Sequence, residues 1–135
     1  YLMAQLREAG LCQELYGPLY KRLFKTGEEG RAPIAALDFP VADPEEAVRC
    51  VTEAGGRAVL AHPGQYGNYE TLPRLVEAGL WGIEAHHPKH SPGDVDRCLQ
   101  LARQYGLAVT GGSDFHGRWG EGETLGETGV PRPPF

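Results

Sequence analysis

The stretch GGSDFHG at residues 111–117 places an aspartate and a histidine two positions apart, at Asp114 and His116. Imidazole nitrogen and carboxylate oxygen are the usual protein ligands of divalent metals such as Zn, Mn or Fe. We expect the pair to stand just beyond a strand, where extended backbone points residues i and i+2 to the same side. Both side chains could then reach one metal ion.

All five histidines of the chain lie after residue 61 and fall at three places. They follow three predicted strands: His62 follows residues 58–61, His86, His87 and His90 follow residues 81–85, and His116 follows residues 107–110. Because the carboxyl ends of neighbouring parallel strands share one face of an α/β sheet or barrel, we expect the three places to meet. His62 alone is typical of a histidine that hydrogen-bonds at a strand end, but the three strand ends together favour a metal site.

The cluster EAHHPKHS at residues 84–91 allows several roles. His90 stands just before Ser91, a predicted helix cap, and a helix N-terminus favours an anion, so we expect His90 to contact a phosphate. His86 and His87 could support metal ligands or face solvent, and solvent exposure is favoured for His86. Glu84 lies within the strand, where an inward hydrogen bond and metal ligation are equally compatible with the pattern.

Helix and strand signals alternate three times between residues 43 and 110. A helix beginning at Asp43 and Pro44 should bury one apolar face, made of Ala47, Val48, Val51 and Ala54. A second helix begins near Thr71, and a third runs from a Ser91 cap to a terminal Gly106. Short connections between alternating elements predict an α/β fold with parallel strands and barrel-like curvature.

Residues 1–40 differ in pattern, because they carry apolar residues at helical spacing and no histidine. A loop at residues 26–33, rich in glycine and charge, and then the sequence Asp-Phe-Pro at residues 38–40 separate them from the rest. We therefore expect a small helical segment at 1–40 and an α/β domain at 41–135.

Composition excludes several classes of protein. The net charge of −5 gives no basic field for long nucleic acid, although a short nucleotide end held by metal ions fits. No apolar run approaches the roughly 20 residues that a membrane span needs. The cysteines, Cys12, Cys50 and Cys98, are expected to be buried free thiols in a reducing compartment, as in a cytoplasmic protein.

Three motifs, AVLAHPGQY, LVEAGLWGIEAHHPKHS and GLAVTGGSDFHG, together resemble the later motifs of the PHP (polymerase and histidinol phosphatase) family. They are most similar to its stand-alone phosphoesterases, which cleave nucleotide 3′,5′-bisphosphates or short oligoribonucleotides. The resemblance covers residues 41–117, and residues 1–40 resemble the helical insertion of this branch. It implies a distorted (β/α)7 barrel with parallel strands, acting on a small phosphorylated substrate such as a nucleotide or a short RNA end.

The resemblance also implies roles for individual residues. It makes His62, Asp114 and His116 metal ligands and His90 the catalytic histidine that meets the substrate phosphate. Gln65 stands where relatives often carry an arginine that holds a phosphate. The full-length protein would bind two or three divalent ions, drawn from Mn, Zn, Fe and Mg.

The family's opening motifs, an H-x-H pair with a nearby Asp and then another His and Glu, do not occur in this sequence, which has no histidine before His62. The chain thus resembles the carboxyl-terminal part of such an enzyme, and we expect it to be inactive alone. The principal alternative is a truncated, catalytically silent PHP-like module that binds metal or regulates. A metal-dependent amidohydrolase is a third possibility, because such barrels also carry His and Asp at one rim.

Overall fold

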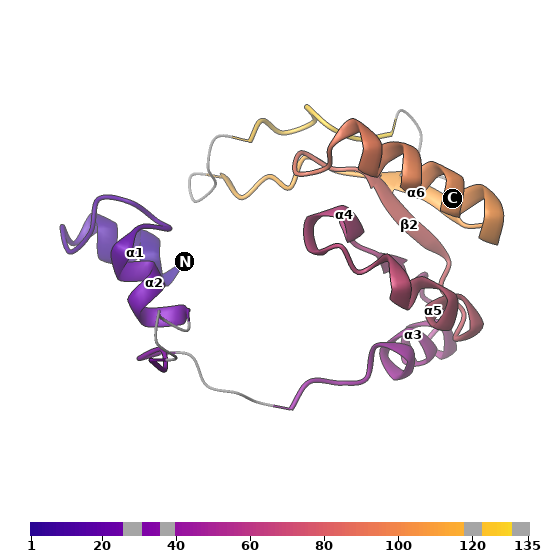
Figure 1. Cartoon of the computed structure of the whole chain (residues 1–135), viewed down its shortest axis with the longest axis horizontal. Helices are drawn as coiled ribbons and strands as arrows, with labels where there is room; N and C mark the ends of the chain where they lie inside the picture. The colour runs from indigo at the N-terminus through magenta and orange to yellow at the C-terminus, as the bar shows by residue number, and fades with distance from the viewer. Residues whose placement is uncertain (26–30, 36–39, 118–122, 131–135) are drawn as a thin grey trace. The chain divides into compact units, whose positions relative to one another are not determined.

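A computed structural model describes residues 1–25, 31–35, 40–117 and 123–130 of the chain (Figure 1). The chain divides into two compact units, residues 1–41 and 42–135. Most of the separating stretches predicted at residues 26–33 and 38–40 lie outside the described residues. The interpretation of residues 1–40 as the helical insertion of the PHP family stays a prediction.

The described residues of the first unit form two short helices, α1 (Leu2–Glu8) and α2 (Pro18–Phe24). Pro18 occupies the first position of α2, where the missing N–H costs no intrahelical bond. The rings of Tyr16, Tyr20 and Phe24 pack in sequence, with centroid separations of 4.9 and 5.5 Å. Both of these elements are helical, in keeping with the apolar spacing of this part of the chain.

The second unit is built on a three-stranded parallel sheet in the order β1-β2-β3. The strands are β1 (Val59–Leu60), β2 (Gly82–His86) and β3 (Ala108–Gly111). Val59 pairs with Gly82, and Gly82 pairs with Ala108 on its other side. The predicted α/β class and the three neighbouring parallel strands are confirmed, with each strand end shifted by one residue.

The helices of this unit are α3 (Pro44–Glu53), α4 (Pro63–Tyr66), the 3₁₀ helix η2 (Tyr69–Thr71), α5 (Leu72–Glu77) and α6 (Pro92–Tyr105). The side chain of Asp43 accepts the backbone N–H groups of Glu45 and Glu46 at 2.9 and 3.1 Å, which begins α3 where the sequence predicted. Ser91 and Asp94 form a reciprocal capping box at the start of α6, and Gly106 ends it at φ 66°.

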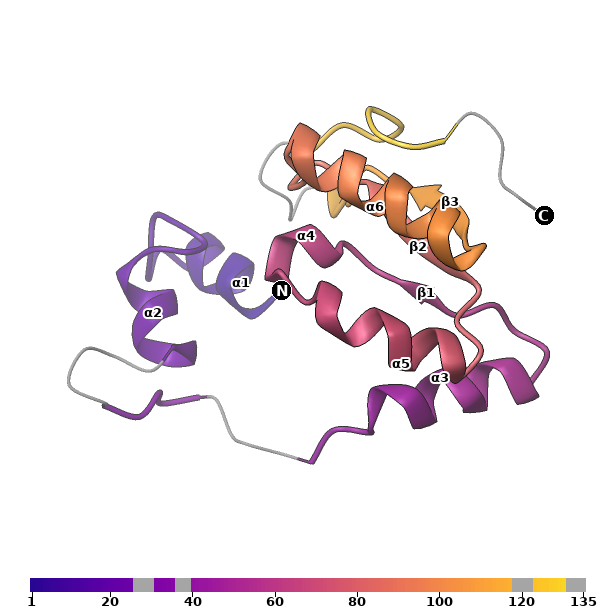
Figure 2. The same ribbon diagram turned by 45° about the vertical axis from the view of Figure 1, so that its right-hand side comes forward.

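The core lies around the central strand β2. Ile83 and Ala85 of this strand are fully buried, and they share one apolar cluster with Leu72 of α5 and Cys98 of α6. Figure 2 shows α6 running along β2 and β3, and α3 lying beside α5. This packing holds the carboxyl ends of the three strands at one edge of the sheet. Among the described helices, none is long and apolar enough to cross a membrane.

Two expectations about burial are wrong. Of the apolar face predicted for α3, only Val48 is buried, whereas Ala47, Val51 and Ala54 are exposed. The reason is that α3 packs against α5 through few residues. Just beyond α5, the Thr52 hydroxyl also donates to the Gly79 carbonyl at 3.4 Å. The three cysteines are free, but only Cys98 is buried; Cys12 is half-buried, and Cys50 is exposed on α3.

Candidate functional site

A β-bulge shapes the edge at which β2 and β3 end. Glu84 pairs with Thr110 and His86 pairs with Gly111, so Ala85 is an extra residue on β2. A Cβ atom on Gly111 would lie 2.6 Å from the His86 Cβ and 2.7 Å from its carbonyl oxygen. Only glycine allows this approach, which brings the loop after β3 next to the loop after β2.

His62, the predicted ligand after β1, has left-handed backbone with φ 30°, which non-glycine residues seldom adopt. Its backbone N–H donates to Glu84 Oε2 at 2.8 Å, and this bond from β2 helps to hold the strained conformation. Its Nδ1 atom is buried and has no hydrogen-bond partner among the described residues. Glu84 therefore makes the inward hydrogen bond, one of the two roles that the sequence left open.

Asp114 and His116 lie together, but not in the way predicted. Asp114 is left-handed, with φ 51°, rather than extended, because β3 already ends at Gly111. The His116 ring folds back, so that its Nδ1 atom lies 2.5 Å from the Asp114 carbonyl oxygen and 3.8 Å from Asp114 Oδ1. The expectation of extended backbone is wrong, although the two side chains do end up close to each other.

Two of the predicted metal ligands have a backbone conformation that is rare for residues other than glycine. In the described ranges, His62 and Asp114 are the two non-glycine residues with positive φ. Such conformations cost about 1–3 kcal/mol each and gather at functional sites. The strain thus coincides with residues that the sequence selected for their chemistry.

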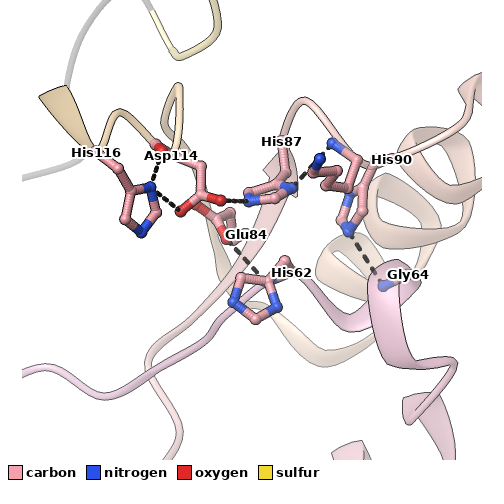
Figure 3. A network of polar contacts seen from close by, with 8 residues as sticks. His62, Gly64, Glu84, His87, His90, Asp114 and His116 are labelled. Atoms are coloured by element: carbon pink, nitrogen blue, oxygen red, sulfur yellow. Dashed lines mark hydrogen bonds and ion pairs between the residues drawn. The ribbon is translucent and has the colours of Figure 1, made fainter. Parts of the chain in front are cut away.

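His87, for which the sequence left open support of metal ligands or exposure to solvent, is buried at the site. It is only 4% exposed, and Figure 3 shows its ring beside the Asp114 carboxylate, at the meeting point of the loops after β2 and β3. His87 Nε2 lies 3.6 Å from Asp114 Oδ2, and the ring centroid lies 5.0 Å from that of His62. Burial lowers the pKa of His87, which keeps the imidazole neutral. The available signal was its position directly after a buried strand.

His90, the predicted phosphate contact, is engaged on both ring nitrogens. Its Nδ1 atom lies 2.8 Å from the carbonyl oxygen of Ala85, and its Nε2 atom accepts the backbone N–H of Gly64 at 3.1 Å (Figure 3). A nitrogen that accepts an N–H carries no proton, so Nδ1 bears the proton and donates to Ala85. A phosphate contact from Nε2 would require the Gly64 bond to break, and the phosphate role stays a prediction.

The remaining candidates lie around this centre. Gln65, the predicted phosphate-binding side chain, is exposed on α4. His86, for which the sequence favoured exposure, is half-buried at the end of β2.

A second polar network supports the loop that carries His62. The hydroxyl of Tyr69 donates to Asp94 Oδ1 at 2.9 Å, and Ser91 donates to Asp94 Oδ2 through its hydroxyl at 2.6 Å. These bonds, that of Ser91 first, lower the pKa of the Asp94 carboxyl. The guanidinium of Arg97 lies over the Tyr69 ring at 4.0 Å. Asp94 is thereby fixed next to Gly64, whose missing Cβ would lie 2.7 Å from Asp94 Cγ.

Known proteins similar in sequence are phosphoesterases. No family model matches the chain. A phosphoribosyl 1,2-cyclic phosphate 1,2-diphosphodiesterase of Eggerthella lenta is 48% identical over 120 residues, which are 89% of this chain and 44% of that protein. A 3′,5′-nucleoside bisphosphate phosphatase of Chromobacterium violaceum is 40% identical over 62% of this chain and 31% of its own. The 5′-3′ exoribonuclease Rnm of Escherichia coli is 39% identical over 73% of this chain and 33% of its own.

This chain is homologous to a portion of PHP-family phosphoesterases. It spans less than half the length of these relatives. Two solved structures match this chain over most of its length. A candidate metal-dependent phosphoesterase of Bifidobacterium adolescentis matches with TM-score 0.77 and 27% identity, covering 93% of this chain and 43% of its own. An amidohydrolase of Chromobacterium violaceum matches with TM-score 0.71 and 29% identity, covering 98% and 45%.

The donor atoms at the ends of the three strands are of types that bind metal ions. The buried, unpartnered Nδ1 of His62 and the carboxylate of Asp114 are a nitrogen and an oxygen donor of the kind that divalent metals take. His116 keeps Nε2 as a further nitrogen beside Asp114. Within the described part of the chain, no group of three or more His, Cys, Asp or Glu is arranged to hold a metal ion. The donor types fit a metal, but no complete ligand set is assembled.

Proposed function

We propose that this chain supplies one side of the active site of a PHP-type metal-dependent phosphoesterase with a distorted (β/α)7 barrel. His62, Asp114 and His116 would bind metal. The observation that supports this most is the meeting of three strand ends, where the buried Nδ1 of His62 has no partner in the described part of the chain and lies near the His87–Asp114 pair. A buried polar atom without a partner is rare, and a bound ion is one explanation for it.

The proposed substrate is a phosphoester of ribose. The names of the three relatives specify a phosphoribosyl cyclic phosphate, a nucleoside bisphosphate and a ribonucleic acid, which share a phosphorylated ribose. We favour nucleotide 3′,5′-bisphosphates or short oligoribonucleotides, and the similarity to the Eggerthella lenta protein adds a ribosyl cyclic phosphate to the class. A net charge of −5 suits a small anion guided by metal rather than a long polyanion.

Each group of this chain has a distinct task in the reaction. Bound metal would lower the pKa of a water molecule and polarise the phosphoryl group. His62 and Asp114 would hold that metal, and the strained backbone of His62 is held by its bond to Glu84. Gln65 on the exposed side of α4 would contact the substrate phosphate, and His90 would do so after releasing Gly64. The ligands for a second or third ion would come from chain beyond these 135 residues.

A second candidate is a catalytically silent PHP-like module that binds metal or regulates. One observation favours it: the described residues contain no group of three or more potential ligands arranged to hold a metal ion. The two candidates differ in what this chain does when the rest of a family active site is present.

A chimera tests the proposal directly. The matching 120 residues of the Eggerthella lenta relative are replaced by those of this chain, and hydrolysis of a ribosyl cyclic phosphate and a nucleoside 3′,5′-bisphosphate is measured with Mn²⁺ and with EDTA. We expect Mn²⁺-dependent hydrolysis that falls at least about 100-fold in Asp114→Asn, because the anionic metal ligand is lost. The control Asp96→Asn, at an exposed position on α6, should retain the activity. A folded chimera without metal-dependent hydrolysis would instead support the silent module.

A further inference from the structure

His87 has a defined proton position that follows from its hydrogen bonds. Its Nδ1 atom accepts the backbone N–H of Lys89 at 3.1 Å. A ring nitrogen that accepts an N–H presents its lone pair, so the neutral imidazole must carry its proton on the other nitrogen. The proton of His87 is therefore on Nε2.

That Nε2–H group is buried and has no acceptor. Nε2 has no hydrogen-bond partner within the described ranges, and the side chain is 2% exposed. The facing acceptor is Asp114 Oδ2 at 3.6 Å, which is beyond hydrogen-bond distance. The ring is held by its neighbours, with the His62 centroid at 5.0 Å and that of His90 at 5.6 Å. His87 thus presents one fixed donor toward one carboxylate.

The neighbouring histidine cannot take this role. Both nitrogens of His90 are occupied, by Ala85 and by Gly64, and its donor points into the β2 backbone. His87 is also unsuited to ligate metal through Nε2, because that atom carries the proton while Nδ1 receives Lys89. His87 can therefore act as a hydrogen-bond donor through its Nε2–H group.

We propose that His87 is a positioning residue for Asp114, whose Oδ2 it holds through its Nε2–H group while Oδ1 is left for a ligand. The proposal rests on the proposed function in one respect, that Asp114 binds metal. A shift of about 0.7 Å would bring Nε2 and Oδ2 into hydrogen-bond range. Such outer hydrogen bonds orient metal ligands and raise their affinity for the ion.

Three substitutions of His87 distinguish the loss of its hydrogen-bond donor from the loss of its side-chain volume. His87→Gln places an amide donor near the position of Nε2, whereas His87→Asn can satisfy only the Lys89 N–H. His87→Phe keeps a ring but has no polar atom. With Mn²⁺ affinity measured by paramagnetic broadening of backbone resonances, we expect Asn and Phe to weaken binding about 10–100-fold and Gln to restore most of it. Equal losses in all three folded variants, or no loss in Phe, would overturn the proposal.

A metal-free measurement distinguishes failure of this inference from failure of the proposed function. Long-range ¹H–¹⁵N spectra of the whole chain should show His87 protonated on Nε2, with a resonance that moves in Asp114→Asn and stays in Asp96→Asn. A proton on Nδ1, or a resonance insensitive to Asp114, would refute the positioning role whether or not metal binds. Loss of the Nε2 proton on adding Zn²⁺ would make His87 a ligand and would also refute it. If the His87 resonance responds to Asp114→Asn but the chain binds no metal, the contact between His87 and Asp114 is supported. The assignment of Asp114 as a metal ligand then fails.

Discussion

His90 links the loop after β2 to the loop after β1, because its Nε2 atom accepts the backbone N–H of Gly64 at 3.1 Å. The same ring donates to Ala85 at 2.8 Å, so the two loops are joined through one side chain. His62 stands two residues before Gly64, and His87 stands three before His90. The positions of the candidate ligand His62 and of His87 therefore depend on this contact.

Gly64→Ala should destabilise the chain and displace the His62 loop. The new Cβ would lie 2.7 Å from Asp94 Cγ and 2.8 Å from His90 Cδ2, and both partners are fixed by hydrogen bonds. Overpacking of this kind costs about 1–3 kcal/mol, measurable by urea unfolding. Gly93→Ala is the matched control, because its Cβ would meet only Ser91 Oγ at 3.7 Å and alanine favours the helix. Equal stability of the two variants would show that the Gly64 contact is loose.

The capping network of Asp94 predicts a specific pH dependence. Its pKa is lowered in the folded chain by the hydrogen bonds of Ser91 and Tyr69. The stabilisation is therefore present above the unfolded value of about 3.9 and is lost as the pH falls through the lower folded value. We expect the free energy of unfolding to drop less between about pH 4 and pH 2 in Asp94→Asn than in the wild type. Asp96→Asn, on the same helix, should follow the wild type, and identical acid profiles for all three proteins would contradict the assignment.

The isolated chain should be a poor catalyst. Phosphoryl transfer depends on positioned charge, and the chain spans 44% of the Eggerthella lenta relative. We predict that with Mn²⁺ this chain hydrolyses a nucleoside 3′,5′-bisphosphate or a ribosyl cyclic phosphate far more slowly than that relative does. Comparable turnover would show that the family's opening motifs are dispensable and that the site is assigned wrongly.

Much of the fold could be predicted from local sequence signals. Asp43 and Ser91 are side-chain caps, Gly106 is a left-handed terminus, and each lies where the sequence places it. The parallel order of the strands follows from the short alternating connections. These features depend on a few neighbouring residues, and so a single sequence contains them.

The site could be predicted only in part. The types of ligand and their places after strands are visible in the sequence, but the bulge at Ala85 depends on the pairing between strands, and Asp114, expected to be extended, is left-handed. The burial of His87 likewise results from packing against His62, and its tautomer results from the backbone of Lys89. Periodicity cannot encode such long-range contacts. For the same reason, it overestimated the buried face of α3.

The most direct test is a metal-binding isotherm of the 135-residue chain with Mn²⁺ and with Zn²⁺, checked by elemental analysis of metal per chain. We predict at most one ion, weakly bound, with the affinity sharply reduced in Asp114→Asn and unchanged in Asp96→Asn. Asn keeps the shape of the aspartate and removes its charge, so the loss would report the anionic ligand itself. Unchanged metal binding in Asp114→Asn would contradict the central claim that the ends of three parallel strands form the metal site.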